Sequence, residues 1–385
     1  MKQQQTIKGI AKQNTAMKKF MVLVVGAFIS SIGSGLTDFG LAIYILKLTG
    51  SVGATGIFAI CAFLPAIMLA PVGGVLAEDF ARAGGMVQLA GSAKLLISPA
   101  IAGLMLQVTT VGTLIMLDMV TFFTTVLIIA FVRKGLVSKK NAATSSVFCR
   151  EISEGISAIR GKKGIMTMIM TMTIATFCLG FVQMLSKPLV LAIAGERELG
   201  ILTTVIALGM MAGSIVISMV KQPKSYLRML SLGLVGCGVF MALIGVSENL
   251  VLIAGFGFLM FVFMPAIQIG AEVLIRANLD NRVQGRAFGL ISLITQMGYI
   301  LAFIAAGILA DLVFEPLMQG NTALATCIGT VIGAGVGRGN ALLIIITGIS
   351  LAVAGLVAAR LKSVRTLEEK EVTNETFTES CPQGL

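Results

Sequence analysis

The chain has 385 residues, of which 56% are hydrophobic and only 12% are charged, and its mean hydropathy is +0.97. A soluble fold of this size cannot bury so much apolar surface, so the composition excludes a soluble globular protein and predicts a polytopic membrane protein. The net charge of +11 indicates contact with anionic lipid at one membrane face, and we expect no nucleic-acid partner.

Uncharged windows of membrane-spanning length predict the secondary structure. A bilayer core about 30 Å thick needs about 20 apolar residues per helix. We expect ten spans, which in chain order are Phe20–Ile45, Gly53–Ala77, Gly84–Leu106, Val111–Val132, Gly164–Leu185, Ile201–Val220, Met229–Gly245, Val251–Leu274, Ala287–Ala310 and Asn340–Ala359. Barrel strands would alternate polar and apolar residues over about ten positions, which these runs do not. The predicted class is an all-α integral membrane protein.

A basic segment divides the predicted spans into four and six. We therefore expect a shortened N-terminal bundle at 1–132, a cytoplasmic linker at 133–163, a six-helix bundle at 164–360 and a cytoplasmic tail at 361–385. Within the linker, Cys149–Arg160 has helical spacing, which predicts a helix along the membrane surface. The stretch Thr322–Val336 is apolar but short and broken by glycine, so we predict an outer loop there.

Basic residues gather on one side of the predicted membrane. The N-terminal segment, the 133–163 linker and the tail hold many of them, whereas the opposite side holds only Lys47, Lys187, Arg197 and Arg338. Cytoplasmic loops retain positive charge, so we predict that both termini are cytoplasmic. The first residues are too polar for a secretory signal. The expected location is the inner membrane of a bacterium.

The residue types that the chain contains, and those that it lacks, disfavour several kinds of functional site. The chain contains no histidine, which removes the usual general base and the commonest zinc ligand. Its six cysteines show no paired spacing, so no disulfide framework is predicted. The run 333–339 is rich in glycine but lacks the lysine and hydroxyl residue of a phosphate-binding loop. We expect no enzyme activity, no metal site and no cofactor.

Charged residues are rare inside the predicted spans. Asp38 lies in the first, Lys94 in the third and Asp118 in the fourth. An ionised group in hydrocarbon is costly and usually has a partner or a function. Without histidine, proton coupling would need a carboxylate, so Asp38 and Asp118 are the candidates, in that order. The alternatives are that either acid forms a structural ion pair with Lys94, or that Asp118 lies near the outer interface.

Uncharged polar residues and one further charged pair complete the candidates. Gln183, Gln268 and Gln296 lie in spans, where they either face a substrate path or form hydrogen bonds between helices. Glu272 and Arg276 have the i, i+4 spacing that favours an ion pair, so we predict a structural role for them.

Four segments carry a resemblance to a known family: Gly33–Ala42 in the first span, Leu117–Phe122 in the fourth, Gln284–Gly289 before the ninth and Ala310–Pro316 after it. In order and spacing they resemble the major facilitator superfamily, and within it the macrolide-efflux-like branch of bacterial drug exporters. The resemblance implies a two-bundle transporter that exports amphipathic, cationic or macrolide-like compounds in exchange for protons. Its implied partners are a small amphipathic substrate, protons and the lipid bilayer.

The resemblance also implies a shortened chain. Such proteins usually have twelve spans, with a gating motif between the second and third. Gly74, Glu78 and Asp79 resemble the start of that motif, but the chain then runs directly into a span that resembles the fifth family helix. The third and fourth family helices are therefore expected to be missing. Two alternatives stay open: a truncated relative that does not transport, and a lipid-handling transporter or scramblase. The chain is expected to be a monomer, or a homodimer that completes the short bundle.

Overall fold

The computed structural model describes residues 2–77, 94–133, 156–157, 159–219, 225–280, 283–319, 329–330, 332–333, 335 and 337–368, while the side chains of 2–20, 66–77 and 286 lie outside this description. Within these ranges the chain forms helices joined by turns. The helices are α1 (Lys2–Thr49), α2 (Val52–Ala77), α4 (Val111–Arg133), α6 (Lys163–Leu191), α7 (Glu196–Met219), α8 (Tyr226–Val246), α9 (Leu250–Arg276), α10 (Gln284–Leu309), the π-helical turn η1 (Ala310–Phe314), α11 (Glu315–Gln319) and α13 (Arg338–Arg360). A short helix, Lys94–Met105, lies between α2 and α4.

The helices confirm the predicted all-α membrane class. Among the described residues, eight helices are long and apolar enough to cross a membrane, and two shorter apolar helices, Val52–Pro65 and Lys94–Met105, fall within the second and third predicted spans. The third predicted span is described only from Lys94, so the expected count of ten stays a prediction. The Gly74, Glu78 and Asp79 motif falls outside the described side chains, as do most of the 133–163 linker and of the Thr322–Val336 loop.

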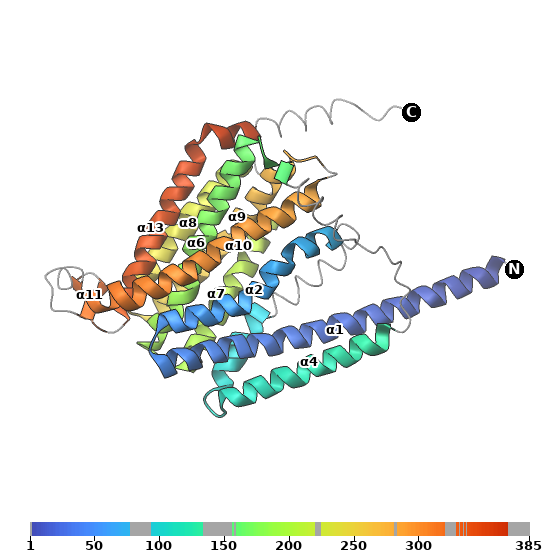
Figure 1. Ribbon diagram of the computed structural model, residues 1–385, viewed down its shortest axis with the longest axis horizontal. Coiled ribbons are helices and arrows are strands. Elements are labelled where there is room, and N and C mark those ends of the chain that lie inside the picture. Colours follow the sequence, from blue (N-terminus) through green and yellow to red (C-terminus); the bar gives the residue numbers. More distant parts are fainter. Residues whose placement is uncertain are drawn as a thin grey trace.

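The helices pack as unequal groups. Figure 1 shows α1 running beside α4, while α6, α8, α9 and α13 lie together on the other side of the molecule. Among the helices labelled in Figure 1, α4 packs extensively on α1 alone. Helix α2 packs more extensively on α10 than on α1, so α2 links the two groups.

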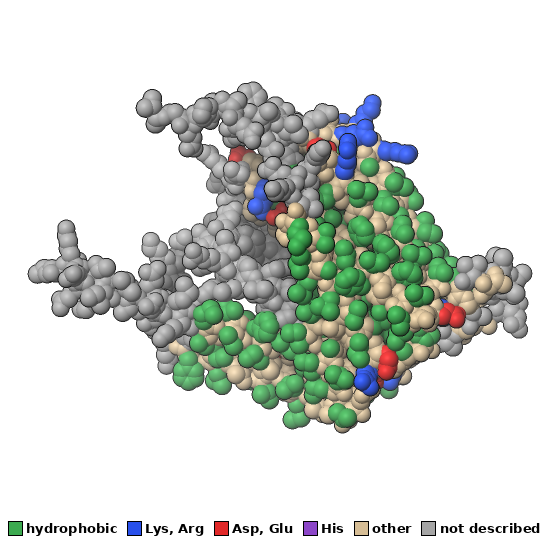
Figure 2. Space-filling model, turned by 180° about the vertical axis from the view of Figure 1, so that it is seen from behind, with side chains coloured by type: hydrophobic (Ala, Val, Ile, Leu, Met, Phe, Trp, Pro, Cys, Tyr) green, Lys and Arg blue, Asp and Glu red, His purple; other side chains and the backbone are tan. Residues whose placement is uncertain are grey.

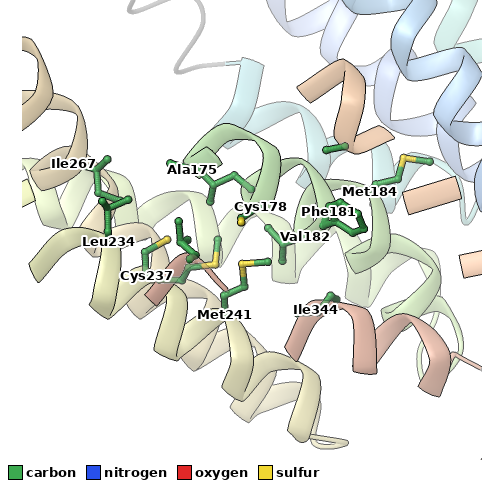
Figure 3. Packing of buried hydrophobic residues seen from close by; sticks show 14 of the residues in the cluster. Ala175, Cys178, Phe181, Val182, Met184, Leu234, Cys237, Met241, Ile267 and Ile344 are labelled. Carbon is green, nitrogen blue, oxygen red and sulfur yellow. The ribbon is translucent and has the colours of Figure 1, made fainter. Parts of the chain in front are cut away.

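The core is apolar and forms where the later helices meet. Cys178 of α6 and Cys237 and Met241 of α8 are buried in one cluster, which Ile267 of α9 and Ile344 of α13 extend (Figure 3). Outside this core, Figure 2 shows apolar side chains across a broad face of the molecule, with the few charged side chains mainly at its margins. This distribution is the one that a surrounding bilayer requires.

Glycine allows two core helices to approach closely. A Cβ atom on Gly238 of α8 would lie 2.5 Å from the backbone nitrogen of Ala352 in α13, and one on Gly348 would lie 2.6 Å from the nitrogen of Ala242. Small residues that let backbones touch are a common basis of helix association in membranes.

Helical structure continues past α13. Residues 362–368 are helical, and Val364 and Leu367 are buried. Leu367 contacts the first turn of α6 at Gly164. The segment predicted as a tail from 361 therefore begins with a packed helix, because it carries apolar residues at helical spacing.

Candidate functional site

Asp38 of α1 and Lys94 of the Lys94–Met105 helix form an ion pair inside the apolar zone. The Nζ of Lys94 lies 2.5 Å from Oδ2 of Asp38. The side chains are 42% and 45% exposed, respectively, so the surrounding protein leaves both partly uncovered. The structure therefore pairs Asp38 with Lys94, which the sequence analysis gave as an alternative to a coupling role. The Asp38 carboxylate remains partly exposed.

Glycine in α1 makes room for this pair. A Cβ on Gly35 would lie 2.6 Å from Cβ of Ser98 and 2.8 Å from Cγ of Lys94, closer than side chains normally approach. The hydroxyl of Ser98 donates a hydrogen bond to the carbonyl of Ile32 at 3.0 Å. The Lys94 stem thus lies against the α1 backbone, which directs its amine to Asp38 one turn further along.

Lys187 lies in a helix, although the sequence analysis placed it in an outer loop. Helix α6 extends through Pro188 to Leu191, so Lys187 lies within the helix, partly buried. The apolar residues that follow Pro188 were the sequence signal that the helix continues.

The face of α6 that carries Lys187 is turned toward α2 and α10. Gly180 and Met184, which precede Lys187 by seven and three positions, lie on the same face. A Cβ on Gly180 would lie 2.5 Å from Cβ of Ala302 in α10, and Cε of Met184 lies 3.6 Å from the position of a Cβ on Gly56 in α2. Lys187 is thus positioned by the contact of α6 with the helices that link the two groups.

Asp118 has a different environment. The hydroxyl of Ser34 in α1 donates a hydrogen bond to Oδ1 of Asp118 at 3.1 Å. Gly33 is packed against Asp118 and Thr121, and the Thr125 hydroxyl donates to the carbonyl of Gly26 at 3.0 Å. Asp118 therefore belongs to a polar seam between α1 and α4, apart from the Asp38 group.

The remaining predicted residues lie elsewhere. Gln183 is exposed one turn before Lys187, Gln296 is half-buried in α10, and Gln268 is exposed in α9. Nη2 of Arg276 lies 2.6 Å from Oε1 of Glu272, and both side chains are more than half exposed. That pair lies on the surface and has no contact with the Asp38 group.

Asp311 connects η1 to the start of α2. Its carboxylate accepts hydrogen bonds from the Ser51 hydroxyl at 2.6 Å, the Val52 amide at 3.0 Å and the Gly53 amide at 2.9 Å. The first amides of a helix have no partner within the helix and carry partial positive charge, so a carboxylate there is stabilising. Below it, a Cβ on Gly307 would lie 2.6 Å from Cα of Gly53, so the α2 and α10 backbones touch.

Two further contacts lie at this same end of the bundle, which we call the predicted outer end because the charge distribution assigns it to the outside. The amine of Lys47 in α1 lies 2.6 Å from Oε1 of Glu196 in α7. A Cβ on Gly103 would lie 2.7 Å from the Glu196 carbonyl and 3.0 Å from Cα of Gly200. Together with the Asp311 bonds and the contact of α2 on α10, these contacts hold the earlier helices against the later ones at this end.

No metal site accompanies these residues in the described part of the chain. Within the described part of the chain, no group of three or more carboxylate or thiol side chains is arranged to hold a metal ion. A groove of about 500 Å³ has only apolar lining, from Phe177 of α6 and Leu301, Ile304, Ala305, Ile308 and Leu309 of α10. Its exposed α10 residues place it on the apolar exterior, away from Asp38.

Solved structures share this arrangement of helices. The chain matches an inward-facing, unoccupied structure of a bacterial homologue of the human lysosomal transporter Spinster with a TM-score of 0.62 and 11% identity, over 93% of this chain and 98% of that one. It matches the nucleoside transporter NupG with a TM-score of 0.50 and 12% identity, over 91% of this chain and 99% of that one. The chain therefore shares the fold of these two transporter structures. No protein-family model and no curated protein sequence matches the chain.

The likeness to these structures concerns the fold. The expected major-facilitator-like class is confirmed, and the matched structures are transporters rather than enzymes. The matched Spinster homologue is described as inward-facing.

Proposed function

We propose that the chain is a secondary active transporter of a small amphipathic molecule. The observation that carries this proposal is an accessible Asp38–Lys94 ion pair within a transporter fold. A partnered charge within a membrane span usually serves a transport path or a proton relay, because apolar residues would be less costly there. Alternating access then requires the contacts at the predicted outer end to break while the opposite end closes.

Asp38 is the residue that we propose for proton coupling. Protonation would remove the negative charge that holds Lys94. One proton would therefore alter the contact between α1 and the Lys94–Met105 helix. Asp118, the second candidate, has a hydrogen bond that explains it as a helix-packing residue.

Transport by reconstituted protein tests both parts of this proposal. Proteoliposomes with an imposed pH gradient would be given a fluorescent amphipathic cation, a radiolabelled macrolide and a dansylated carboxylate. We expect accumulation of at least one probe that collapses when the gradient is dissipated. Failure of every probe to move above empty liposomes would overturn the transporter proposal.

The Asp38→Asn variant isolates coupling from folding. We expect it to lose gradient-driven accumulation by at least tenfold but to keep exchange of internal and external probe, which needs no proton transfer. Glu272→Gln is the matched control, because it removes a carboxylate from a surface ion pair of similar length. Equal gradient dependence in Asp38→Asn and the parent would exclude Asp38 as the coupling residue.

The resemblance supplies a finer form of the proposal. It supports membership of the macrolide-efflux-like branch, proton-driven drug export that would confer drug resistance, and a location in a bacterial inner membrane with both termini inside. It also supports the division into bundles at 1–132 and 164–360, with the third and fourth family helices missing from the first. These features remain proposals.

A shortened relative that does not transport is the second candidate. The packing of α4 favours it, because among the labelled helices α4 has one extensive neighbour, α1, and so depends on few protein contacts. Insertion of two spans between Glu78 and Arg82 distinguishes the candidates. Transport by the natural chain supports the first candidate, whereas transport only after insertion supports the second.

A further inference from the structure

The π-helical turn η1 and the first residue of α11 carry two carboxylates that bind the starts of two different helices. Asp311 accepts the amides of Val52 and Gly53 in α2, at 3.0 and 2.9 Å. Four residues later, Oε1 of Glu315 accepts the amide of Gly337 at 2.6 Å, where α13 begins. One short segment therefore contacts an early helix through one carboxylate and a late helix through the other.

The two helix starts compensate the charge of this segment. Carboxylates at i and i+4 repel each other, so Asp311 and Glu315 need positive charge from elsewhere. The first amides of a helix carry partial positive charge and lack partners within the helix. The glycine-rich run 333–339, which the sequence analysis rejected as a phosphate-binding loop, offers such an amide to the chain's own Glu315. Each carboxylate is therefore directed at a helix start.

Backbone packing fixes Glu315 on α13. A Cβ on Gly339 would lie 2.5 Å from the Glu315 nitrogen and 2.5 Å from the Phe314 carbonyl oxygen, and neither atom can rotate away. The Gln319 side chain donates a second hydrogen bond to Oε1 of Glu315 at 3.1 Å. The backbone of Gly337 has a φ of 86°, which favours glycine, so the turn that directs its amide to Glu315 requires that residue.

The neighbouring arginine binds a different acid. Arg338 is only 5% exposed, and its Nη2 lies 3.1 Å from Oε1 of Glu248 in the loop between α8 and α9. Oε2 of Glu315 and Nη1 of Arg338 are buried, and neither has a hydrogen-bond partner among the described residues. Within the described part of the chain, Glu315 is thus held by the Gly337 amide and Gln319 and not by an ion pair.

The turn between the two carboxylates can change shape. Helices bend at π-helical turns, and such turns are frequent at functional sites. Leu312 and Val313 lie between Asp311 and Glu315 and are 73% and 47% exposed, so little protein packing holds them. Beyond the turn, α10 and α13 both pack on α6, whereas α2 reaches η1 from the earlier helices. Relative motion of the two groups is therefore expected to fall between η1 and α2.

We propose that η1 is a hinge of the predicted outer end, in which Glu315 is a positioning residue and Asp311 is the residue that binds and releases α2. Held on α13 by Glu315, the turn presents Asp311 to the α2 amides. Opening breaks the Asp311 bonds and leaves Glu315 in place. This inference rests on the proposed function, since it assumes alternating access, but the accessibility of buried residues tests it without transport.

Labelling of two single cysteines tests the order in which the bonds break. Thr55→Cys reports the start of α2 and Asn340→Cys the start of α13, since these residues are 3% and 4% exposed. The cysteine-free full chain in right-side-out vesicles would receive a membrane-impermeant maleimide from outside. Asp311→Asn should speed labelling at Thr55→Cys about fivefold and leave Asn340→Cys unchanged, whereas Glu315→Ala should speed both. Equal acceleration at both sites in Asp311→Asn would overturn the proposal.

A double variant tests whether Glu315 acts through Asp311. Thr55→Cys should label no faster in Asp311→Asn/Glu315→Ala than in Asp311→Asn, because the bond that Glu315 positions is already weakened. Glu315→Gln keeps an oxygen for the Gly337 amide and should label like the parent. Asn249→Ala is the matched control, since it removes the acceptor of another helix-start amide, in α9. Multiplied effects in the double variant, or an unchanged rate in a monodisperse Glu315→Ala protein, would overturn the role of Glu315.

Transport in proteoliposomes separates this inference from the proposed function. The ordered effects at the two cysteines, without movement of any probe, would support the hinge and count against transport. Movement of a probe, with equal acceleration at both sites in Asp311→Asn, would support transport and overturn the hinge.

Discussion

At the scale of single residues, the two interior carboxylates differ in their surroundings. Asp38 is paired with Lys94, so a change in its charge affects the contact between α1 and the Lys94–Met105 helix. Asp118 accepts one neutral hydrogen bond, from Ser34. The same residue type in two neighbouring spans therefore suits two different tasks, and burial alone does not distinguish them.

Replacement of Asp118 should show a packing role. Asp118→Asn keeps an oxygen that can accept the Ser34 hydroxyl, so we expect an unchanged unfolding temperature and unchanged gradient-driven transport. Asp118→Leu removes the acceptor and should lower stability by about 1 kcal/mol. Thermal unfolding in detergent measures this difference. Loss of transport in Asp118→Asn with an unchanged unfolding temperature would instead assign the coupling role to Asp118.

At the scale of elements, backbone contact between α8 and α13 depends on the absence of a side chain. Gly238 and Gly348 bring the helices so close that an added Cβ would meet backbone atoms, which cannot rotate away. Gly255, exposed in α9, has no neighbour within 4 Å of such a Cβ. Glycine thus has a packing function in one helix and none in the other.

Alanine at these two glycines should have opposite effects. Gly238→Ala forces α8 and α13 apart and should destabilise the chain by about 1–3 kcal/mol. Gly255→Ala should be neutral or stabilise by up to about 1 kcal/mol, because alanine is the better helix former. Unfolding temperatures of the two variants in one detergent provide the comparison. Equal values would mean that α8 and α13 do not pack as described.

At the scale of the whole molecule, the closed predicted outer end is the feature that relates structure to transport. The Asp311 bonds to the start of α2, the Lys47–Glu196 ion pair and the Gly103–Gly200 contact join helices from the beginning and the later part of the chain. Opening of this end would have to break these polar bonds and separate α2 from α10, whose backbones touch at Gly53 and Gly307.

Removal of the Asp311 charge should favour opening. Asp311→Asn weakens the interaction with the α2 amides by about 1 kcal/mol, which predicts about fivefold faster modification of a residue that the contact buries. Thr55→Cys in a cysteine-free background provides the thiol whose modification rate reports opening, since Thr55 is 3% exposed. The measurement is labelling by a membrane-impermeant maleimide from outside. Glu272→Gln should label like the parent, and an equal rate in Asp311→Asn would exclude Asp311 as part of the closure.

The amino-acid sequence by itself determined the class of the molecule, because apolar length and the position of charges depend on the bilayer and not on tertiary contacts. The sequence alone also predicted most helix positions, the rarity of interior charges and the pairing of Glu272 with Arg276. The same reasoning assigned Lys187 to an outer loop, because a lysine followed by proline resembles the end of a span.

Only the tertiary structure decided which charges meet. Asp38 and Lys94 are 56 positions apart, and Ser51 and Asp311 are 260 apart, so no local pattern links them. Their contacts follow from the packing of α1 on the Lys94–Met105 helix and of α2 on α10, which glycines at Gly35, Gly53 and Gly307 permit. The ion pair of the candidate site is therefore a property of the folded chain: it exists only where those helices bring the two side chains together.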